Sequence, residues 1–132
     1  MAVNLQTSKL KLFRGGGENS QYASSPFVTK IEFRLRLAGI SYSVDGGAPW
    51  LGPKGKIPYI ELLADDGAGQ VKDGNTLLGD SALIIKHLVE THNLQDLNDN
   101  LAPADKARDL ALRALLEDKL YFYHVRRVHG LF

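Results

Sequence analysis

A proline at the start of a predicted strand constrains the fold of this chain more than any other residue. Pro58 directly precedes the run Tyr-Ile-Glu-Leu-Leu at 59–63, which is typical of a strand. Because proline has no N–H to donate, it is confined within sheets to edge strands or to a strand's first position. The sequence therefore predicts a bend at residue 58. A cis bond between Ile57 and Pro58 would turn the backbone N–H and C=O of Ile57 outward, where an extended ligand can pair with them.

A strongly apolar helix is predicted to begin at Asp80 and Ser81. Its predicted buried face consists of Ile84, Ile85, Leu88 and Val89. The first N–H groups of a helix lack partners within it, and the helix dipole is positive there, so this start favours an anion. Together with the bend at Pro58, it predicts one site that holds a short peptide by its backbone and its carboxylate.

The chain before the bend predicts a strand and then a helix. Residues 9–14 alternate, with Leu10, Leu12 and Arg14 on one face, which indicates a short strand. The glycines at 15–17 follow this strand. Since no Gly-Lys-Ser/Thr comes after them, a flexible linker is favoured over a phosphate-binding loop.

The helix is predicted to begin at Ser25 and Pro26, because serine is a preferred N-cap and proline a preferred first helical residue. Gly39 is predicted to end it. Glu32 and Arg36 are expected to pair on one side of this helix, four residues apart. The predicted buried face consists of Phe27, Ile31, Leu35 and Ala38.

The remaining elements complete a small sheet. Residues 40–44 predict a second strand, and residues 46–55 an irregular or one-turn helical connection in which Trp50 is expected to anchor the loop. After Pro58, a turn rich in aspartate and glycine leads to a fourth strand around residues 70–72, which forms a hairpin with the third. This order predicts an α/β fold, a mixed sheet with helices on its faces.

Pro103 is predicted to start a last helix that continues past Tyr123. Its wide apolar face needs a cover, so we expect packing against the preceding domain, a partner chain or a region beyond Phe132. The sequence alone does not indicate which of these three covers the apolar face. The apolar residues at helical spacing are Ala107, Leu110, Ala111, Ala114, Leu115, Tyr121, Val125 and Val128.

Composition excludes several classes of protein. With 132 residues, 44% of them hydrophobic, the chain can bury the core of one domain with an extra element. The 16 Lys and Arg residues and 15 Asp and Glu residues are spread without blocks, which gives no electrostatic reason to expect nucleic acid or an anionic membrane as a partner. No apolar run approaches the about 20 residues of a membrane span, and we expect a cytoplasmic protein. Cysteine is absent, which excludes disulfides, thiolate zinc sites and redox cysteines.

The order of elements resembles the thioredoxin fold, and three motifs resemble the N-terminal domain of glutathione transferases. Residues 25–30, Ser-Pro-Phe-Val-Thr-Lys, resemble the start of that domain's first helix. Residues 56–60, Lys-Ile-Pro-Tyr-Ile, resemble its loop with a cis proline. Residues 79–85, which begin Gly-Asp-Ser, resemble the motif that grips the γ-glutamyl group.

Within that superfamily, the chain looks most like the failed-axon-connections and metaxin-like branch, on residues 35–42, 53–61, 80–88 and 116–121. The resemblance implies a thioredoxin-like (βαβ-ββα) glutathione-binding domain over residues 1–95. It also implies a linker at 96–132 with the first helix of an all-α C-terminal domain. Since such proteins continue into that domain, the resemblance implies a truncated chain.

By resemblance, Ser25 occupies the position of a catalytic serine or cysteine that keeps the thiol of glutathione ionised. Lowering a thiol pKa of about 8.5 by about two units needs about 2.7 kcal/mol. A hydrogen bond to an anion contributes about 1.5 to 3 kcal/mol and a helix N-terminus about 0.3 to 1, which together suffice. Ser25 can equally be a plain N-cap, and Ser24 or Tyr22 can be the donor instead. Valine at position 28 and the absence of cysteine argue against glutaredoxin-like thiol transfer.

The resemblance implies further contacts with glutathione. Lys56 would meet the glycyl carboxylate, the backbone of Ile57 beside Pro58 would pair with the tripeptide, and Asp80 with Ser81 would hold the γ-glutamyl group. The alternatives are a solvated Lys56 and a plain N-cap at Asp80. The four histidines, at 87, 92, 124 and 129, show no metal-ligand spacing, so no metal site is expected. For Tyr121, Phe122 and Tyr123, packing is favoured over an electrophile pocket.

Two functions follow from the resemblance. One is a glutathione transferase, in which Ser25 stabilises the thiolate and the sulfur attacks a hydrophobic electrophile, with glutathione as a substrate. The other is a non-catalytic interaction protein with a vestigial glutathione site. A homodimer or a partner chain that covers the last helix is expected in either case. The sequence does not identify the electrophile.

Overall fold

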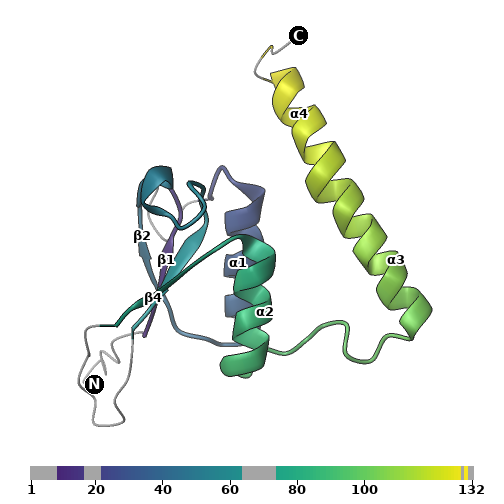
Figure 1. The fold of residues 1–132 in the computed structure, drawn as a ribbon, viewed down its shortest axis with the longest axis horizontal. Helices are drawn as coiled ribbons and strands as arrows, with labels where there is room; N and C mark the ends of the chain where they lie inside the picture. The colour runs from purple at the N-terminus through teal and green to yellow at the C-terminus, as the bar shows by residue number, and fades with distance from the viewer. Residues whose placement is uncertain (1–8, 17–21, 64–73, 129, 131–132) are drawn as a thin grey trace. The chain divides into compact units, whose positions relative to one another are not determined.

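The computed structural model describes residues 9–16, 22–63, 74–128 and 130. The chain divides into two compact units, Met1–Gln95 and Asp96–Phe132. The first unit carries a sheet and two helices, and the second carries a loop followed by one long helix (Figure 1). Among the described residues, no helix has the length and apolar character needed to cross a membrane.

The first unit is built on a four-stranded mixed sheet in the order β2-β1-β3-β4. Its strands are β1 (Leu10–Phe13), β2 (Ser43–Asp45), β3 (Tyr59–Leu62) and β4 (Thr76–Gly79). Strand β1 runs parallel to β2 and antiparallel to β3, and β3 runs antiparallel to β4. Helix α1 (Pro26–Leu37) connects the parallel pair, as a crossover requires. The predicted α/β fold is confirmed.

Helix α1 and helix α2 (Ser81–Thr91) lie on the same face of the sheet (Figure 1). Side chains alternate along a strand, so Leu10 and Leu12 of β1 are buried under these helices while Lys11 and Phe13 belong to the other face. The predicted face of α2 is confirmed, with Ile84 and Leu88 at its centre. The buried core consists of Leu10, Leu12, Val28, Ile31, Leu35, Ile60, Leu62, Ile84, Leu88 and Leu94.

The buried face of α1 is rotated from the predicted one. Val28 and Glu32 are buried, while Phe27 is half-buried and Ala38 is exposed. Glu32 faces inward because Arg14, at the end of β1, supplies a buried positive charge. The guanidinium of Arg14 lies 3.5 Å from the Glu32 carboxylate, and the two side chains are 0% and 10% exposed.

Arg36, which the sequence predicts as the partner of Glu32, forms a hydrogen bond with Tyr42. Its Nε donates to the Tyr42 hydroxyl at 2.9 Å. This bond raises the pKa of Arg36, and the charge of Glu32 is the smallest of the contributions to the pKa shift. Glu32 is thus paired with Arg14 and Arg36 is bonded to Tyr42, while the charge of Glu32 still acts favourably on Arg36.

Tyr59 holds the loop between β2 and β3 against the other face of the sheet. Its ring stacks on Phe13, with the ring centroids 4.4 Å apart, and its hydroxyl donates to the C=O of Ala48 at 3.3 Å. A Cβ atom at Gly47 would lie 2.6 Å from the Tyr59 hydroxyl, and one at Gly52 would lie 2.8 Å from the Tyr59 ring. Both positions therefore require glycine.

Several boundaries differ from the predicted ones. Trp50, in the one-turn helix η1 (Pro49–Leu51), is 80% exposed, so the prediction that it anchors the loop is wrong. The second strand lies at Ser43–Asp45, later than the predicted 40–44, because Ile40 and Tyr42 pack on the core from outside the sheet. The predicted fourth strand at 70–72 and the turn before it lie outside the described residues. Strand β4 lies further along the chain.

Helix α2 begins at a residue with an unusual backbone conformation. Asp80 is the N-cap, with φ 75° and ψ 121°, and its carboxylate accepts from the N–H groups of Ala82 at 2.9 Å and Leu83 at 3.4 Å. A non-glycine residue at positive φ costs on the order of 1 to 3 kcal/mol, and a cap returns about 0.5 to 2. The capping bonds therefore offset much of the backbone strain. The predicted helix start is confirmed.

The second unit is a loop that continues into an unbroken helix. Its segments are α3 (Pro103–Ala114), the π-helical η2 (Leu115–Leu120) and α4 (Tyr121–Val128). The predicted start at Pro103 is confirmed, whereas the wider π turns were not predicted. Its exposed apolar side chains include Leu110, Leu112, Leu115, Leu116, Leu120, Phe122 and Tyr123.

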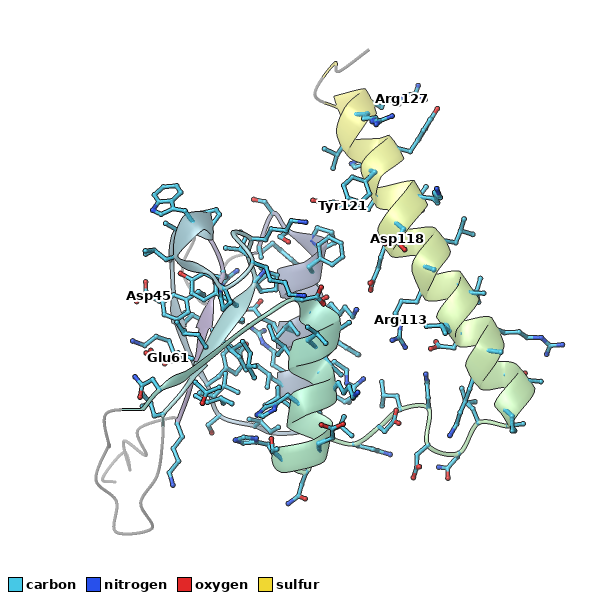
Figure 2. All side chains as sticks on the ribbon, in the orientation of Figure 1. Asp45, Glu61, Arg113, Asp118, Tyr121 and Arg127 are labelled. Carbon is cyan, nitrogen blue, oxygen red and sulfur yellow. The ribbon has the colours of Figure 1, made fainter. Side chains whose placement is uncertain are left out.

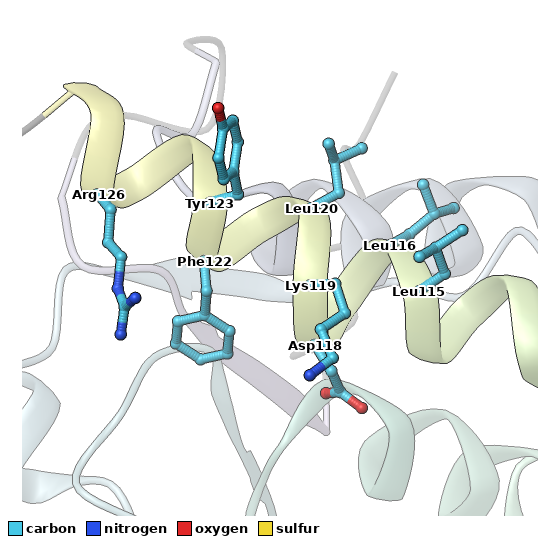
Figure 3. A pocket seen from close by; sticks show the side chains of 8 residues that line it. All are labelled: Leu115, Leu116, Asp118, Lys119, Leu120, Phe122, Tyr123 and Arg126. Atoms are coloured by element: carbon cyan, nitrogen blue, oxygen red, sulfur yellow. The ribbon is translucent and has the colours of Figure 1, made fainter.

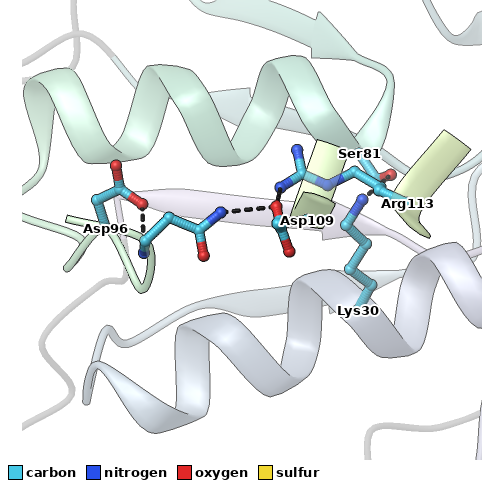
Figure 4. A network of polar contacts seen from close by, with 6 residues as sticks. Lys30, Ser81, Asp96, Asp109 and Arg113 are labelled. Carbon is cyan, nitrogen blue, oxygen red and sulfur yellow. Dashed lines mark hydrogen bonds and ion pairs between the residues drawn. The ribbon is translucent and has the colours of Figure 1, made fainter. Parts of the chain in front are cut away.

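Polar bonds fasten the loop of the second unit to α3 (Figure 4). One carboxylate oxygen of Asp109 accepts from the side chains of Asn98 and Arg113, both at 2.7 Å. The carboxylate of Asp96 accepts from the N–H of Asn98 at 2.9 Å. The loop is therefore ordered by its own unit.

We predict that Arg14→Met lowers the free energy of unfolding by about 3 kcal/mol, because it leaves the buried carboxylate of Glu32 without its counter-ion. The double variant Arg14→Met/Glu32→Leu should recover most of the loss, since it removes both buried charges. Urea unfolding with an unchanged m-value measures both effects. The matched control is Lys11→Met, because Lys11 forms a solvent-accessible pair with Glu61 at 3.7 Å that should contribute less than about 1 kcal/mol. Figure 2 labels Glu61. A double variant as unstable as the single one would contradict this account.

We also predict that Asp80→Ala lowers the free energy of unfolding by about 1 kcal/mol, because it removes the cap and keeps the strained backbone. Asp80→Asn should stay within about 0.5 kcal/mol of the parent, since asparagine caps helices and tolerates positive φ. Thermal unfolding of the two variants side by side measures the difference. Equal stability of the alanine and asparagine variants would show that the cap is not needed.

Candidate functional site

Three segments distant in the sequence meet at one end of the sheet. Tyr59, which begins β3, pairs with Gly79 at the end of β4 and with Phe13 at the end of β1. Pro58 directly precedes β3, and Asp80 directly follows β4. Because these two strands are antiparallel, the bend and the start of α2 lie side by side. Helix α1 runs back from the end of β1 toward the start of the parallel strand β2, so its first residues lie at this end too. The site is therefore assembled by the topology of the sheet.

Ser25 precedes the first residue of α1, but its hydroxyl does not cap the helix. Its backbone is extended, and its C=O accepts from the N–H of Thr29 at 3.2 Å. The side chain makes no capping hydrogen bond and is half-buried at the positive end of the helix dipole. The alternative donors differ, because Ser24 is exposed and Tyr22 is 99% exposed.

The Ile57–Pro58 peptide bond is cis, and Pro58 is buried. Within the described part of the chain, the backbone N–H and C=O of Ile57 make no hydrogen bond. The side chain of Ile57 packs on Gly15, where an added Cβ would lie 2.2 Å from the Ile57 Cδ1 atom. Gly15 also has φ +81°, so this position favours glycine both sterically and conformationally. Gly15 therefore supports the bend.

A lysine links the two helix starts of this site. Lys30 Nζ donates to the hydroxyl of Ser81 at 3.4 Å, from the second turn of α1 to the first residue of α2 (Figure 4). Ser81 is only 6% exposed, and its hydroxyl lies at the positive end of α2. Lys30 adds a full positive charge there. Lys30 belongs to the motif at residues 25–30, but no spacing in the sequence predicts its contact with Ser81.

Two further lysines border the site. Lys56, two residues before Pro58, is exposed. This exposure fits both a solvated side chain and a side chain that binds an anion. Lys54 is exposed as well, and its Cγ lies 3.7 Å from the position that a Cβ on Gly79 would take. No cluster of three potential metal ligands occurs in the described ranges.

The histidines of α2 lie at its opposite end. His92 is the C-cap of α2, and its Nδ1 lies 2.6 Å from the hydroxyl of Thr91. Partial burial, followed by the charge of His87, lowers the pKa of His92 below its ordinary value. Because His92 follows the last residue of α2, it takes no part in the site at the start of that helix.

A hollow of about 800 Å³ lies on the helix of the second unit (Figure 3). Phe122 and Tyr123 contribute to it, but Tyr121 does not. The charged side chains at its margin are Asp118, Lys119 and Arg126, and its apolar lining consists of Leu115, Leu116, Leu120, Phe122 and Tyr123. The hollow follows the π-helical turns of η2 and suits an apolar group.

Comparison with known proteins identifies the family. Residues 26–129 match the family model described as the glutathione S-transferase N-terminal domain, which is well over half of the chain. Searches among curated proteins and among solved structures found no match. The matched range contains the Pro58 bend and the Asp80-Ser81 helix start, and it begins one residue after Ser25. With its mixed sheet and two helices on one face, the chain belongs to the glutathione S-transferase N-terminal domain family and has the thioredoxin-like fold of that domain.

Proposed function

We propose that this protein binds glutathione at the end of the sheet where Ser25, Pro58 and Asp80 meet, and that it transfers glutathione to an electrophile through a new bond at the glutathione sulfur. The observation that carries the proposal is the convergence of these three segments in a chain of this family. Each offers a different group to the tripeptide: a hydroxyl, an unpaired stretch of backbone and a helix start. Glutathione is thus a substrate of the protein.

The tripeptide would lie across the bend. The backbone N–H and C=O of Ile57 pair with its central residue, as an added strand would. Lys56 meets the glycyl carboxylate as a point charge. At the other end, the carboxylate of Asp80 accepts from the γ-glutamyl ammonium group, and the hydroxyl of Ser81 lies beside the γ-glutamyl carboxylate. Lys30, already bonded to Ser81, adds positive charge at that carboxylate.

Ser25 would donate its hydroxyl hydrogen to the sulfur of glutathione. The hydroxyl is not used to cap α1, so this donor is available without loss of a helix contact. One bond to a thiolate and the dipole of α1 together supply the about 2.7 kcal/mol needed to lower the thiol pKa by about two units. The thiol proton is released to solvent, and the thiolate then bonds to the electrophilic atom as that atom's leaving group departs with its electron pair. No covalent intermediate with the protein is needed.

A second candidate is a non-catalytic interaction protein of the metaxin-like and failed-axon-connections branch, with a vestigial glutathione site. The observation that favours it is the row of exposed apolar side chains on α3, η2 and α4, which a partner chain or a second copy would cover. We assign Asp96–Phe132 to the linker and first helix of an all-α domain in both cases. The two candidates differ in whether glutathione binds.

We predict that glutathione at 100 times its dissociation constant stabilises the protein by about 2.7 kcal/mol, because it binds only the folded chain. A thermal-shift titration measures this effect. Ser25→Ala should keep the affinity similar and abolish the ultraviolet thiolate absorbance of bound glutathione, because the donor to the sulfur is lost.

Two neighbouring variants serve as matched controls for Ser25. Ser24→Ala and Tyr22→Phe should leave the thiolate absorbance unchanged, since both side chains are exposed and lie outside the helix start. Loss of the absorbance in either control would transfer the role to that residue. If millimolar glutathione produces no thermal shift, the transferase proposal fails and the interaction role is favoured.

A further inference from the structure

The two ends of the proposed glutathione site differ in how firmly their polar groups are held. At the γ-glutamyl end, Ser81 is only 6% exposed, and its hydroxyl accepts from Lys30 Nζ at 3.4 Å (Figure 4). The Lys30 side chain is itself half-buried. The carboxylate of Asp80 is held by its capping bonds to the N–H groups of Ala82 and Leu83. The polar groups of this end are therefore in place before a ligand binds.

The glycyl end is open to solvent. The side chain assigned to it is Lys56, which is exposed. Gly55, the residue before it, has φ +62°, and a Cβ atom there would meet nothing within 4 Å beyond its chain neighbours. Pro53 and Lys54 of the same loop are also exposed. This end therefore offers a solvated cation with space around it.

This difference in burial makes the γ-glutamyl end the stronger contact. Water and salt screen a partly buried charge less than an exposed one. One hydrogen bond to a charged group is worth about tenfold to hundredfold in affinity, whereas an exposed ion pair is worth up to about fivefold. A ligand without the γ-glutamyl carboxylate would also displace water from Ser81 without replacing its hydrogen bond. Affinity is therefore expected to depend mainly on the γ-glutamyl group.

We propose that the protein recognises γ-glutamyl thiols as a class, with Lys30 as the specificity-determining residue and little discrimination at the third residue of the peptide. The inference rests on the proposed glutathione site. The γ-glutamyl carboxylate lies between the hydroxyl of Ser81 and the ammonium group of Lys30, at the positive end of α2. Peptides that lack the glycine, or carry a larger residue in its place, keep these contacts and fit the open end.

Calorimetric titration of the full chain with four thiols tests the substrate class. γ-Glutamylcysteine and γ-glutamylcysteinylserine should bind within about fivefold of glutathione, because they change only the exposed contact with Lys56. Cysteinylglycine, which lacks the γ-glutamyl group, should bind at least about tenfold more weakly than glutathione. This series uses the parent protein, so it does not depend on how well any variant folds.

Variants of the lysines test the assignment to Lys30. Lys30→Met should weaken the binding of glutathione and of γ-glutamylcysteine by about tenfold or more, and should not change the binding of cysteinylglycine. A general loss of structure would weaken all three ligands. Lys56→Met should weaken the binding of glutathione by no more than about fivefold. The matched control is Lys86→Met, which removes an exposed lysine from α2 and should leave every affinity unchanged.

The outcomes separate this inference from the proposed function. If glutathione binds but γ-glutamylcysteine binds more than about fivefold more weakly, the third residue is recognised and the substrate class is wrong, while the glutathione site stands. If Lys30→Met keeps the affinity of the parent for glutathione, or weakens cysteinylglycine to the same extent, Lys30 does not determine specificity. If none of the four thiols binds, the glutathione site itself is refuted and the inference falls with it.

Discussion

The pairing of β3 with a strand on each side is the interaction on which the rest of the structure depends. Because side chains alternate along a strand, a slip of one residue would send Ile60 and Leu62 out of the core and bring Glu61 into it. Pro58 cannot donate to a neighbouring strand, so the strand begins at Tyr59. This register also places the bend beside Asp80. The core and the candidate site are thus set by the same strand.

Two contacts beneath the candidate site tie it to the core. The buried ion pair of Arg14 and Glu32 joins the end of β1 to α1, and the next residue, Gly15, packs on the side chain of Ile57. On the other face, Tyr59 fixes the loop that leads to the bend. The backbone of Ile57 is therefore held from both faces of the sheet. Such support limits the entropy that an extended ligand would have to remove on binding.

The sequence predicted the starts of elements well because each start has a local cause. Pro58, Pro26 and Pro103 mark strand or helix starts through their missing N–H and fixed φ, and Asp80 marks one through its capping oxygen. The order of these elements predicted the mixed sheet. The same order of elements places the segments of Ser25, Pro58 and Asp80 at one end of the sheet, because the rules for connecting strands and helices depend only on that order.

The predictions that were wrong concern features that depend on contacts between residues distant in the sequence. The buried face of α1 could not be assigned without knowing that Glu32 pairs with Arg14. Arg14 lies on the same face of β1 as Leu10 and Leu12, which indicated that it is buried and that an acidic side chain pairs with it. Trp50 and Tyr59 are both aromatic, and only the close approach of Gly47 and Gly52 to Tyr59 shows which one anchors the loop. Within the site, the unused hydroxyl of Ser25 and the bond from Lys30 to Ser81 depend on side-chain geometry.

We propose that the end of the sheet is a single glutathione site built from three segments. A titration of the ¹⁵N-labelled full chain with glutathione, followed by amide chemical shifts, tests this most directly. The account predicts shift changes that saturate together at residues next to Ser25, at Ile57 and at residues 81–83. Changes confined to α3 and α4, or no change with millimolar glutathione, would contradict it.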